Sequence, residues 1–329
     1  MSNIAVLGSN SFAGAAYVAR AIRDGHNVIG INRSPEGPEI FLPYRREPNR
    51  SNYVFHQGDV NHDLPRILEV IRDHRAAIVV DFAGQGMVAE SWQSPEQWYE
   101  TNIVSKVKLH NSLRKLDFLE RYVRISTPEV YGSQEELLKE TYVYNPSTPY
   151  AVSHAAIDMS LRAFRRNYDF PVIFTRFANF YGAGQQLYRI VPRTIIYALE
   201  GKTLQLHGGG KAVRAFIHAE DVAQGIVCSI EEGRLGDIYH FSPERFVTIR
   251  ELVEIICQRM GVVFDDLVEV APDRPGKDLR YLMDSQRARN ELGWVERFSL
   301  EEGLDSTIQW IKDNLAEIRS LEWDYVHKP

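Results

Sequence analysis

The sequence predicts an α/β fold, in which a doubly wound parallel sheet is covered by helices on both faces. Short apolar runs alternate with longer amphipathic stretches through the first half of the chain. Such alternation indicates βαβ crossovers, which run right-handed and bury both faces of a parallel sheet. The length of 329 residues also allows one large α/β unit with a smaller lobe.

The expected elements follow one another in a regular order. Strands are expected at residues 4–7, 27–31, 54–55, 77–82, 122–126 and 172–177. Helices are expected at residues 12–23, 64–74, 95–116, 150–168 and 300–315. After about residue 180 the loops lengthen and glycines cluster, which indicates that the smaller lobe begins there.

Composition excludes several classes of function. The net charge is -6 without a long basic run, so we expect no nucleic acid partner. No run of 18 apolar residues occurs, so we expect no membrane span. The two cysteines, Cys228 and Cys257, lie far apart, which favours reduced thiols and a cytoplasmic protein without a signal peptide. No metal-binding pattern of histidines occurs, so no metal site is expected.

A glycine-rich turn joins the first expected strand to the first helix. Its pattern is Gly8-x-x-Ser11-x-x-Gly14, with Phe12 at the start of the helix. Glycines permit a tight turn and a close approach of the backbone to a pyrophosphate, which the helix N-terminus then faces. Serine replaces the middle glycine, but it can still admit a phosphate. The pattern predicts a dinucleotide-binding Rossmann-type fold, with an ordinary strand–helix turn as the alternative.

The ends of the following strands supply the other expected cofactor contacts. The second strand ends in Asn32 and Arg33, without the acidic residue that binds the adenosine ribose, and Arg33 suits a 2′-phosphate. The sequence therefore favours NADP over NAD, with a solvated loop charge as the alternative for Arg33. The contacts expected after the third and fourth strands come from Asp59, Val60, Ala83 and Gly84. The alternative for Asp59 is a helix cap.

These patterns predict how the chain divides. An NAD(P)-binding Rossmann domain is expected over residues 1–178, with residues from about 215 to 250 interleaved. A smaller α/β substrate-binding lobe is expected over residues 179–214 and 251–329. The last residues, 323–329, are expected to attach loosely to the surface.

A series of motifs then resembles a known family. They are Tyr150-Ala151-Val152-Ser153-His154 and the segments 126–132, 176–182, 218–223 and 273–278. Nearly end to end, the chain resembles the extended short-chain dehydrogenase/reductases, most closely the nucleotide-sugar 4,6-dehydratases of the dTDP-glucose 4,6-dehydratase type. The resemblance implies an enzyme that binds NAD or NADP and a nucleotide-diphosphate sugar. It also implies a homodimer, built from the helices near residues 100–116 and 151–168.

The resemblance assigns catalytic roles to four residues. Tyr150 takes the proton of the sugar 4-hydroxyl, Thr127 hydrogen-bonds the 4-oxygen and Glu129 removes the C5 proton. His154 stands where the family has a lysine, and a neutral imidazole lowers the pKa of a tyrosine less than a lysine does. The structural alternatives are a helix-end hydroxyl for Tyr150, a strand-end cap for Thr127, a solvated carboxylate for Glu129, and a surface or cofactor-ribose contact for His154. Both Tyr150 and His154 are also expected to contact the cofactor.

Three residues match the family's substrate contacts. Asn179 and Arg214 correspond to residues that hold the diphosphate, and Arg274 corresponds to one near the nucleotide. The planar guanidinium suits phosphate because it donates two hydrogen bonds at once. Surface ion pairs are the alternative for both arginines.

Pro128 departs from the family pattern. The similar dehydratases carry an aspartate there, which protonates the departing 6-hydroxyl, and proline has no such proton to give. Water or Glu129 could take over this task. The departure keeps two alternatives open: a nucleotide-sugar C4-epimerase or C4-oxidoreductase, and a non-catalytic homologue that only binds cofactor and nucleotide-sugar. Glu129 favours the dehydratase, because an epimerase needs no base at C5.

Overall fold

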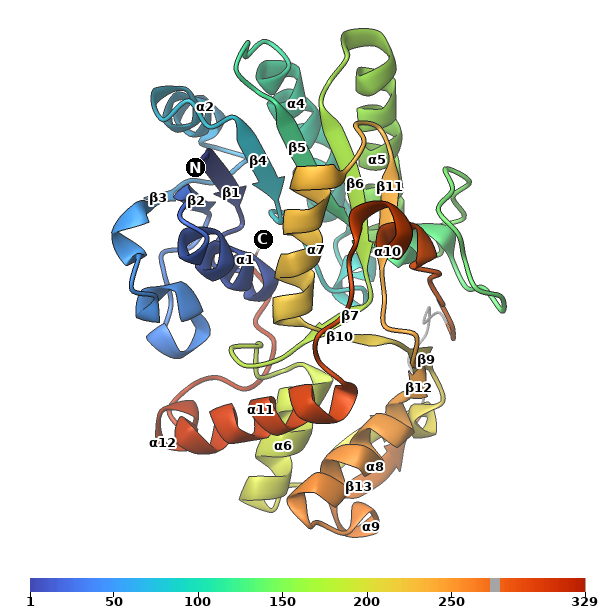
Figure 1. The fold of residues 1–329 in the computed structure, drawn as a ribbon. Coiled ribbons are helices and arrows are strands. Elements are labelled where there is room, and N and C mark those ends of the chain that lie inside the picture. Colours follow the sequence, from blue (N-terminus) through green and yellow to red (C-terminus); the bar gives the residue numbers. More distant parts are fainter. Residues whose placement is uncertain (273–278, 329) are drawn as a thin grey trace.

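The computed structural model describes residues 1–272 and 279–328. Its centre is a seven-stranded parallel sheet with the strand order β11-β6-β5-β4-β1-β2-β3 (Figure 1), which confirms the predicted fold class. The order reverses between β1 and β4, where doubly wound sheets bind ligands. The strands are β1 (Asn3–Leu7), β2 (Asn27–Asn32), β3 (Tyr53–Gln57), β4 (Ile78–Asp81), β5 (Arg121–Ser126), β6 (Val172–Phe177) and β11 (Ile238–Phe241).

Helices cover both faces of this sheet (Figure 1), because alternate apolar residues of each strand face opposite sides. One face packs against α1 (Phe12–Arg23), α7 (Ala219–Glu232) and α10 (Gln286–Leu292). The other face packs against α2 (Leu64–Asp73), α4 (Lys106–Leu113) and α5 (Pro149–Tyr168). The helix predicted at residues 95–116 is α3 (Pro95–Tyr99), a π-helical turn η5 (Glu100–Ser105) and α4 in succession.

A smaller lobe lies below the carboxyl ends of the sheet in Figure 1 and has its own apolar core. Its elements are α6 (Ile190–Glu200), α8 (Ile249–Met260), α9 (Phe264–Leu267), α11 (Leu300–Asp313), α12 (Leu315–Ile318), and β8 (Leu204–His207) paired with β13 (Val268–Ala271). The predicted domain boundaries stay a prediction. In the part of the chain described here, no helix is both long and apolar enough to cross a bilayer.

Short elements connect the sheet to the lobe. Two strand pairs, β7 (Asn179–Tyr181) with β10 (Phe216–His218) and β9 (Val213–Arg214) with β12 (Val247–Thr248), lie between them. The 3-10 turns are η1 (Glu39–Phe41), η2 (Pro43–Arg46), η3 (Arg50–Asn52), η4 (Glu90–Trp92), η6 (Pro128–Tyr131) and η7 (Gly208–Gly210).

A buried ion pair fixes the loop that follows β4. The Asp81 carboxylate accepts hydrogen bonds from Lys106 Nζ at 2.5 Å and from the Tyr122 hydroxyl at 2.5 Å. The Ala83 amide donates to Asp81 Oδ1 at 3.1 Å, which fixes the start of the loop. Burial raises the pKa of Asp81, but the charges of Lys106 and Arg124 outweigh it and hold that pKa below its usual value. The carboxylate therefore stays charged and orients the loop.

Breaking this pair will destabilise the fold. We expect Lys106→Met to lower the free energy of unfolding by about 3 kcal/mol, because it leaves the charge of Asp81 buried without a partner. Urea unfolding measures this loss. Lys108→Met is the matched control, since the Lys108 side chain is 58% exposed, and its effect should stay under about 0.5 kcal/mol. Equal effects of the two substitutions would contradict this role of the pair.

Candidate active site

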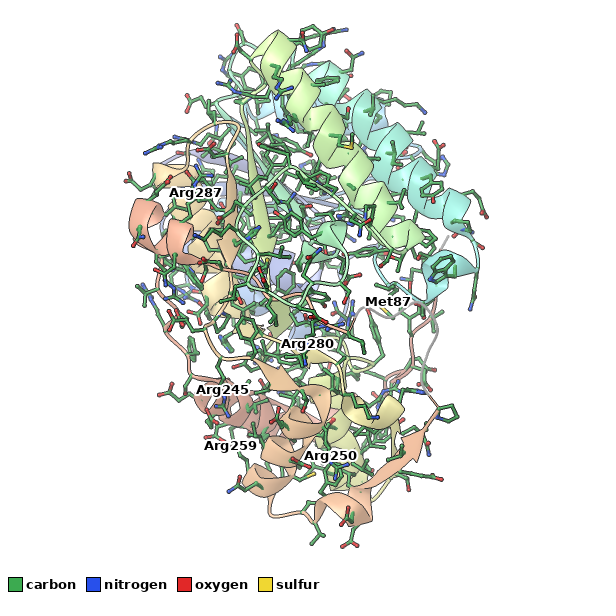
Figure 2. The ribbon with its side chains drawn as sticks, turned by 90° about the vertical axis from the view of Figure 1, so that its right-hand side faces the viewer. Met87, Arg245, Arg250, Arg259, Arg280 and Arg287 are labelled. Atoms are coloured by element: carbon green, nitrogen blue, oxygen red, sulfur yellow. The ribbon has the colours of Figure 1, made fainter. Side chains whose placement is uncertain are left out.

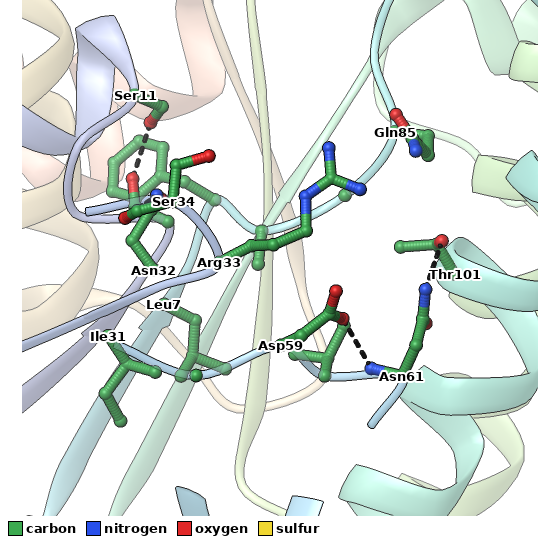
Figure 3. A pocket seen from close by; sticks show the side chains of 16 residues that line it. Leu7, Ser11, Ile31, Asn32, Arg33, Ser34, Asp59, Asn61, Gln85 and Thr101 are labelled. Carbon is green, nitrogen blue, oxygen red and sulfur yellow. Dashed lines mark hydrogen bonds between the residues drawn. The ribbon is translucent and has the colours of Figure 1, made fainter. Parts of the chain in front are cut away.

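An open crevice lies beside the carboxyl ends of β1, β2 and β4. It occupies the place where the strand order reverses. Arg33 extends its side chain across the crevice towards Gln85 (Figure 3). The predicted cofactor residues that line it are Gly8, Ser11, Asn32, Arg33, Asp59, Val60, Ala83 and Gly84.

The turn between β1 and α1 leaves no room for larger residues. Gly8 has φ +79°, and a Cβ there would lie 2.8 Å from the Ala83 amide nitrogen. A Cβ at Gly14 would collide with the Gly8 carbonyl oxygen. Ser11 caps the helix: its hydroxyl donates to Gly8 O at 2.7 Å and accepts from Gly14 N at 3.2 Å. Since the first turn of α1 carries no acidic residue, its N-terminus fits a pyrophosphate.

Phe12 and Gly14 stand behind this turn and do not line the crevice. Phe12 is buried and packs with Ala16 and Ala219. The structure therefore gives both residues a part in shaping the turn. Phe12 also begins α1, whose N-terminus fits a pyrophosphate, so the contacts predicted for these two residues stay a prediction.

Asp59 turns the chain at the edge of the crevice and does not cap a helix. The cap of α2 is Asp63, whereas Asp59 Oδ1 accepts the Asn61 amide at 2.8 Å. Asn61 Nδ2 in turn donates to Thr101 Oγ1 at 3.0 Å (Figure 3). These bonds join the end of β3 to the π-helical turn η5.

Asn102, in η5, ties the crevice to the helix that carries Tyr150. Its side-chain oxygen accepts from Gln85 N at 2.8 Å, and its Nδ2 donates to Gln85 O at 3.1 Å and to Ser153 Oγ at 3.0 Å. Sequence reasoning missed this residue, because apolar periodicity does not reveal a π-helical turn. Such turns are frequent at functional sites.

Thr127, Glu129 and Tyr150 come together where β5 ends and α5 begins. The Tyr150 and Thr127 hydroxyls are hydrogen-bonded, and Thr127 Oγ1 also accepts the Glu129 amide at 3.3 Å. Burial and the charge of Glu129 raise the pKa of Tyr150 above its ordinary value, and the bond with Thr127 lowers it. Thr127 thus caps η6, as its structural alternative proposed, and contacts Tyr150 as well.

Tyr281 brings two predicted substrate residues to this group. Its hydroxyl donates to Asn179 Oδ1 at 3.0 Å, and the Arg214 guanidinium lies 4.0 Å from the centre of its ring. Burial raises the pKa of Tyr281 to about 12, against the lowering effect of Arg214. The charge of Glu129 adds to this rise, which indicates that Tyr281 lies near the group of Thr127, Glu129 and Tyr150. Sequence reasoning missed Tyr281, although it closely follows the 273–278 motif.

His154 lies beside Tyr150, one helical turn further along α5. The two ring centres are 4.5 Å apart, and Nδ1 of the half-buried His154 lies 3.0 Å from Arg124 Nη2. This position is not a surface contact. Arg274 lies outside the described residues. Among those residues, no group of three or more His, Cys, Asp or Glu side chains could hold a metal ion.

The prediction of a loosely attached tail is wrong for residues 323–328. The Lys328 carbonyl oxygen accepts from Arg33 Nη2 at 3.1 Å and from Gln85 Nε2 at 2.9 Å, both of which line the crevice. The His327 ring stacks on Trp98, with 5.3 Å between ring centres. The tail therefore lies across the crevice and joins its two sides.

Comparisons with known proteins agree with this geometry. The profile of the family described as GDP-mannose 4,6 dehydratase matches residues 6–307. The dTDP-glucose 4,6-dehydratase of Neisseria meningitidis serogroup B is 31% identical over 95% of this chain and 94% of its own length. The structure of DesIV, a dTDP-glucose 4,6-dehydratase from Streptomyces venezuelae solved with NAD, is 30% identical, covers 96% of this chain and 98% of its own, and has a TM-score of 0.88.

A second solved structure extends the comparison to epimerases. The UDP-glucose 4-epimerase of Thermotoga maritima, solved with UDP-glucose, is 25% identical, covers 95% of this chain and 99% of its own, and has a TM-score of 0.85. The fold is thus shared with enzymes of both kinds. Since the family profile spans nearly the whole chain, the protein belongs to the GDP-mannose 4,6-dehydratase family.

Proposed function

We propose that the protein is a nucleotide-sugar 4,6-dehydratase, which oxidises C4, eliminates water across C5 and C6, and returns hydride to C6. The observation that carries the proposal is the group of Thr127, Glu129 and Tyr150. Asn102 links this group to the dinucleotide crevice through Gln85 and Ser153. The dTDP-glucose 4,6-dehydratases among its relatives support the same activity.

Tyr150 is the base for the first step. Its phenolate takes the proton of the sugar 4-hydroxyl. The single hydroxyl proton of Thr127, which bonds Tyr150 in the structure, is donated to the 4-oxygen as that oxygen loses its proton. Bound NAD(P) would supply an acceptor for the C4 hydride and a donor of hydride to C6, and its positive charge would favour the Tyr150 phenolate. His154, next to Tyr150, would face the ribose of this cofactor.

Glu129 is the base for the elimination. The C4 ketone acidifies the C5 proton, which the Glu129 carboxylate removes. The same carboxyl then gives this proton to the 6-hydroxyl as the C6–O bond breaks, so that water leaves and the carboxylate is restored. When hydride returns to C6, C5 takes up one proton, which balances the proton that Tyr150 removed from the 4-hydroxyl and must release to become a phenolate again. Pro128 cannot donate a proton, and its place at the first position of η6 is structural, since proline is favoured there. Glu129 therefore serves as base and acid in turn.

The position of Glu129 separates this proposal from C4-epimerisation. An epimerase needs Tyr150 and Thr127 but no carboxylate at C5. The charge of Glu129 acts on both Tyr150 and Tyr281, so the carboxylate stands at the reacting centre. This arrangement favours elimination over epimerisation.

The diphosphate of the substrate binds between β7 and β9 in this proposal. Asn179 begins β7 and Arg214 ends β9, and Tyr281 lies between their side chains. Arg214 also donates to Val213 O at 2.7 Å, which orients its guanidinium. The fork of donors suits a diphosphate oxygen.

The products formed by Glu129→Gln test the function. We expect the unaltered protein to convert one of a panel of nucleotide-hexoses to a 4-keto-6-deoxy sugar, as seen by NMR, without net cofactor consumption. Glu129→Gln should slow this reaction by about 10²- to 10⁴-fold, because the C5 base is lost. It should still exchange hydride at C4, which nicotinamide absorbance reports. The proposal fails if every 6-hydroxyl stays intact, and the role of Glu129 fails if turnover is unchanged.

We propose that NADP is preferred over NAD, although the DesIV relative was solved with NAD. At the end of β2 the position of the usual acid is taken by Asn32, which bonds to Ser34 O at 3.0 Å. Arg33 lines the crevice, and Lys328 Nζ lies 3.3 Å from Ser34 Oγ. Two cations near one strand end favour a 2′-phosphate.

Binding titrations with Arg33→Ala test the cofactor choice. We expect NADP to bind the unaltered protein more tightly than NAD, and Arg33→Ala to reduce NADP affinity by about 10-fold, the loss of one charge-assisted hydrogen bond. NAD affinity should change little. Tighter binding of NAD by the unaltered protein would refute the preference.

We also propose that the protein forms a homodimer through the helices η5–α4 and α5, which run side by side (Figure 2). Ile157 and Leu161 of α5 are fully buried inside the protein and cannot take part in this contact. Val104, Val152 and Met159 are exposed by 41%, 37% and 61%. Exposed apolar side chains gathered on two neighbouring helices favour an interface.

Charge introduced on this face will separate the subunits. We expect Val152→Glu combined with Met159→Glu to halve the mass measured by light scattering, because the two carboxylates would be buried unpaired. Leu235→Glu, at a residue that is also 37% exposed but follows α7, is the control and should leave the mass unchanged. A monomeric mass of the unaltered protein would refute the dimer.

A further inference from the structure

Arg124 and His154 form a hydrogen bond that determines where the histidine carries its proton. Arg124 Nη2 lies 3.0 Å from His154 Nδ1. A guanidinium has donors only, so Nδ1 must accept this bond and cannot carry a proton itself. The bond therefore excludes the imidazolium and the Nδ1–H tautomer. The proton sits on Nε2, at the edge of the ring that faces away from Arg124.

Arg124 is fixed in place by a shared carboxylate. It is 3% exposed, and its Nε donates to Asp158 Oδ1 at 3.2 Å. Asp158 Oδ2 accepts from Arg176 Nη2 at 2.9 Å and from the Ser126 hydroxyl at 2.6 Å. Two guanidinium groups thus share one carboxylate, which leaves one excess positive charge. This charge persists at all working pH values because arginine does not deprotonate.

Three cations act on His154 from the elements packed against its helix. Burial lowers the pKa of His154 well below its ordinary value, and the charges of Arg124, Lys106 and Arg176 lower it further. They come from β5, α4 and β6. Among the described residues, the acid of the same helix that bonds to these arginines is Asp158, which pairs with both of them. Asp81 pairs with Lys106. A positive charge on His154 would be repelled by Arg124, Lys106 and Arg176.

We propose that Arg124 is a positioning residue that holds His154 as the neutral Nε2–H tautomer, so that His154 offers Tyr150 and the cofactor ribose a hydrogen bond and not a charge. The inference rests on the role of Tyr150 proposed above. The fixed positive charge of the site is that of Arg124, which lies on β5 behind His154. A lysine at position 154 would stand within reach of this guanidinium and be repelled by it.

Nitrogen-15 NMR of histidine-labelled protein tests the tautomer directly. His154→Gln identifies the signal among those of the 10 histidines, by its loss. We expect the neutral Nε2–H pattern to persist from about pH 5.5 to about pH 8.5, where an ordinary histidine titrates. A protonation midpoint above about pH 6, or the Nδ1–H tautomer, overturns the proposal. This measurement needs neither substrate nor activity, so it stands apart from the proposed function.

Two matched substitutions test whether Arg124 is the cause. In Arg124→Met the His154 signal should begin to titrate. The pH profile of kcat should then show an additional inflection that comes from the titration of His154. At pH 8 kcat should fall about 10-fold to 100-fold with KM for the nucleotide-sugar unchanged. Arg176→Met removes a guanidinium from the same Asp158 but no bond to His154, so the His154 tautomer should persist. The proposal is overturned if Arg124→Met leaves the tautomer fixed, or if Arg176→Met releases it equally. If either variant does not fold, the tautomer of His154 in the unaltered protein decides whether the proposal holds.

Discussion

The carboxylate of Asp158 holds together the three elements on which the proposed chemistry depends. It binds Arg124 of β5 and Arg176 of β6 from its own position in α5. All three side chains are buried, so the loss of the carboxylate would leave two charges without a partner, at a cost of several kcal/mol. Thr127 directly follows β5, and α5 carries Tyr150 and His154. The relative position of these groups is therefore set by electrostatics inside the protein.

Steric limits shape one side of the crevice beside β1, β2 and β4. The turn at Gly8 and Gly14 is so close to its neighbours that a Cβ at either residue would collide with backbone atoms. Ser11 fits where a glycine is usual because its hydroxyl bonds back to Gly8 O and caps α1. On the far side, Asp81 and Asn102 hold the loop after β4 by hydrogen bonds to its backbone. The walls of the crevice are thus fixed without a ligand.

The departures from the family pattern are absorbed by neighbouring residues. Pro128 opens η6 and presents Glu129, which can both take and return a proton. At position 154, where the resemblance implies a lysine, His154 bonds to Arg124, which we propose supplies the fixed positive charge. The proton donor that is missing at position 128 is supplied by the next residue in the sequence in our proposal, and the cation that is missing at position 154 by a residue adjacent in space. Such local compensation agrees better with an enzyme than with a homologue that has lost its chemistry.

Local patterns in the sequence determined much of this protein. The alternation of strands and helices predicted the parallel sheet, because side-chain periodicity follows from backbone geometry alone. The turn at Gly8, Ser11 and Gly14 predicted the crevice, since its steric constraints act between residues close in sequence. Elsewhere the periodicity was insufficient: it gave one regular helix at 95–116, where the structure has the π-helical turn with Asn102.

Only the tertiary structure decided the contacts between distant residues. Arg124 meets His154 across 30 residues, Tyr281 meets Asn179 across 102, and Arg33 meets Lys328 across 295. No short-range pattern encodes such pairs, because they depend on how strands and lobes pack. The sequence by itself thus determined the fold and which residue types could react. The protonation of His154, the burial of Ile157 and Leu161 and the course of the tail depended on packing and on the charges that packing brings together.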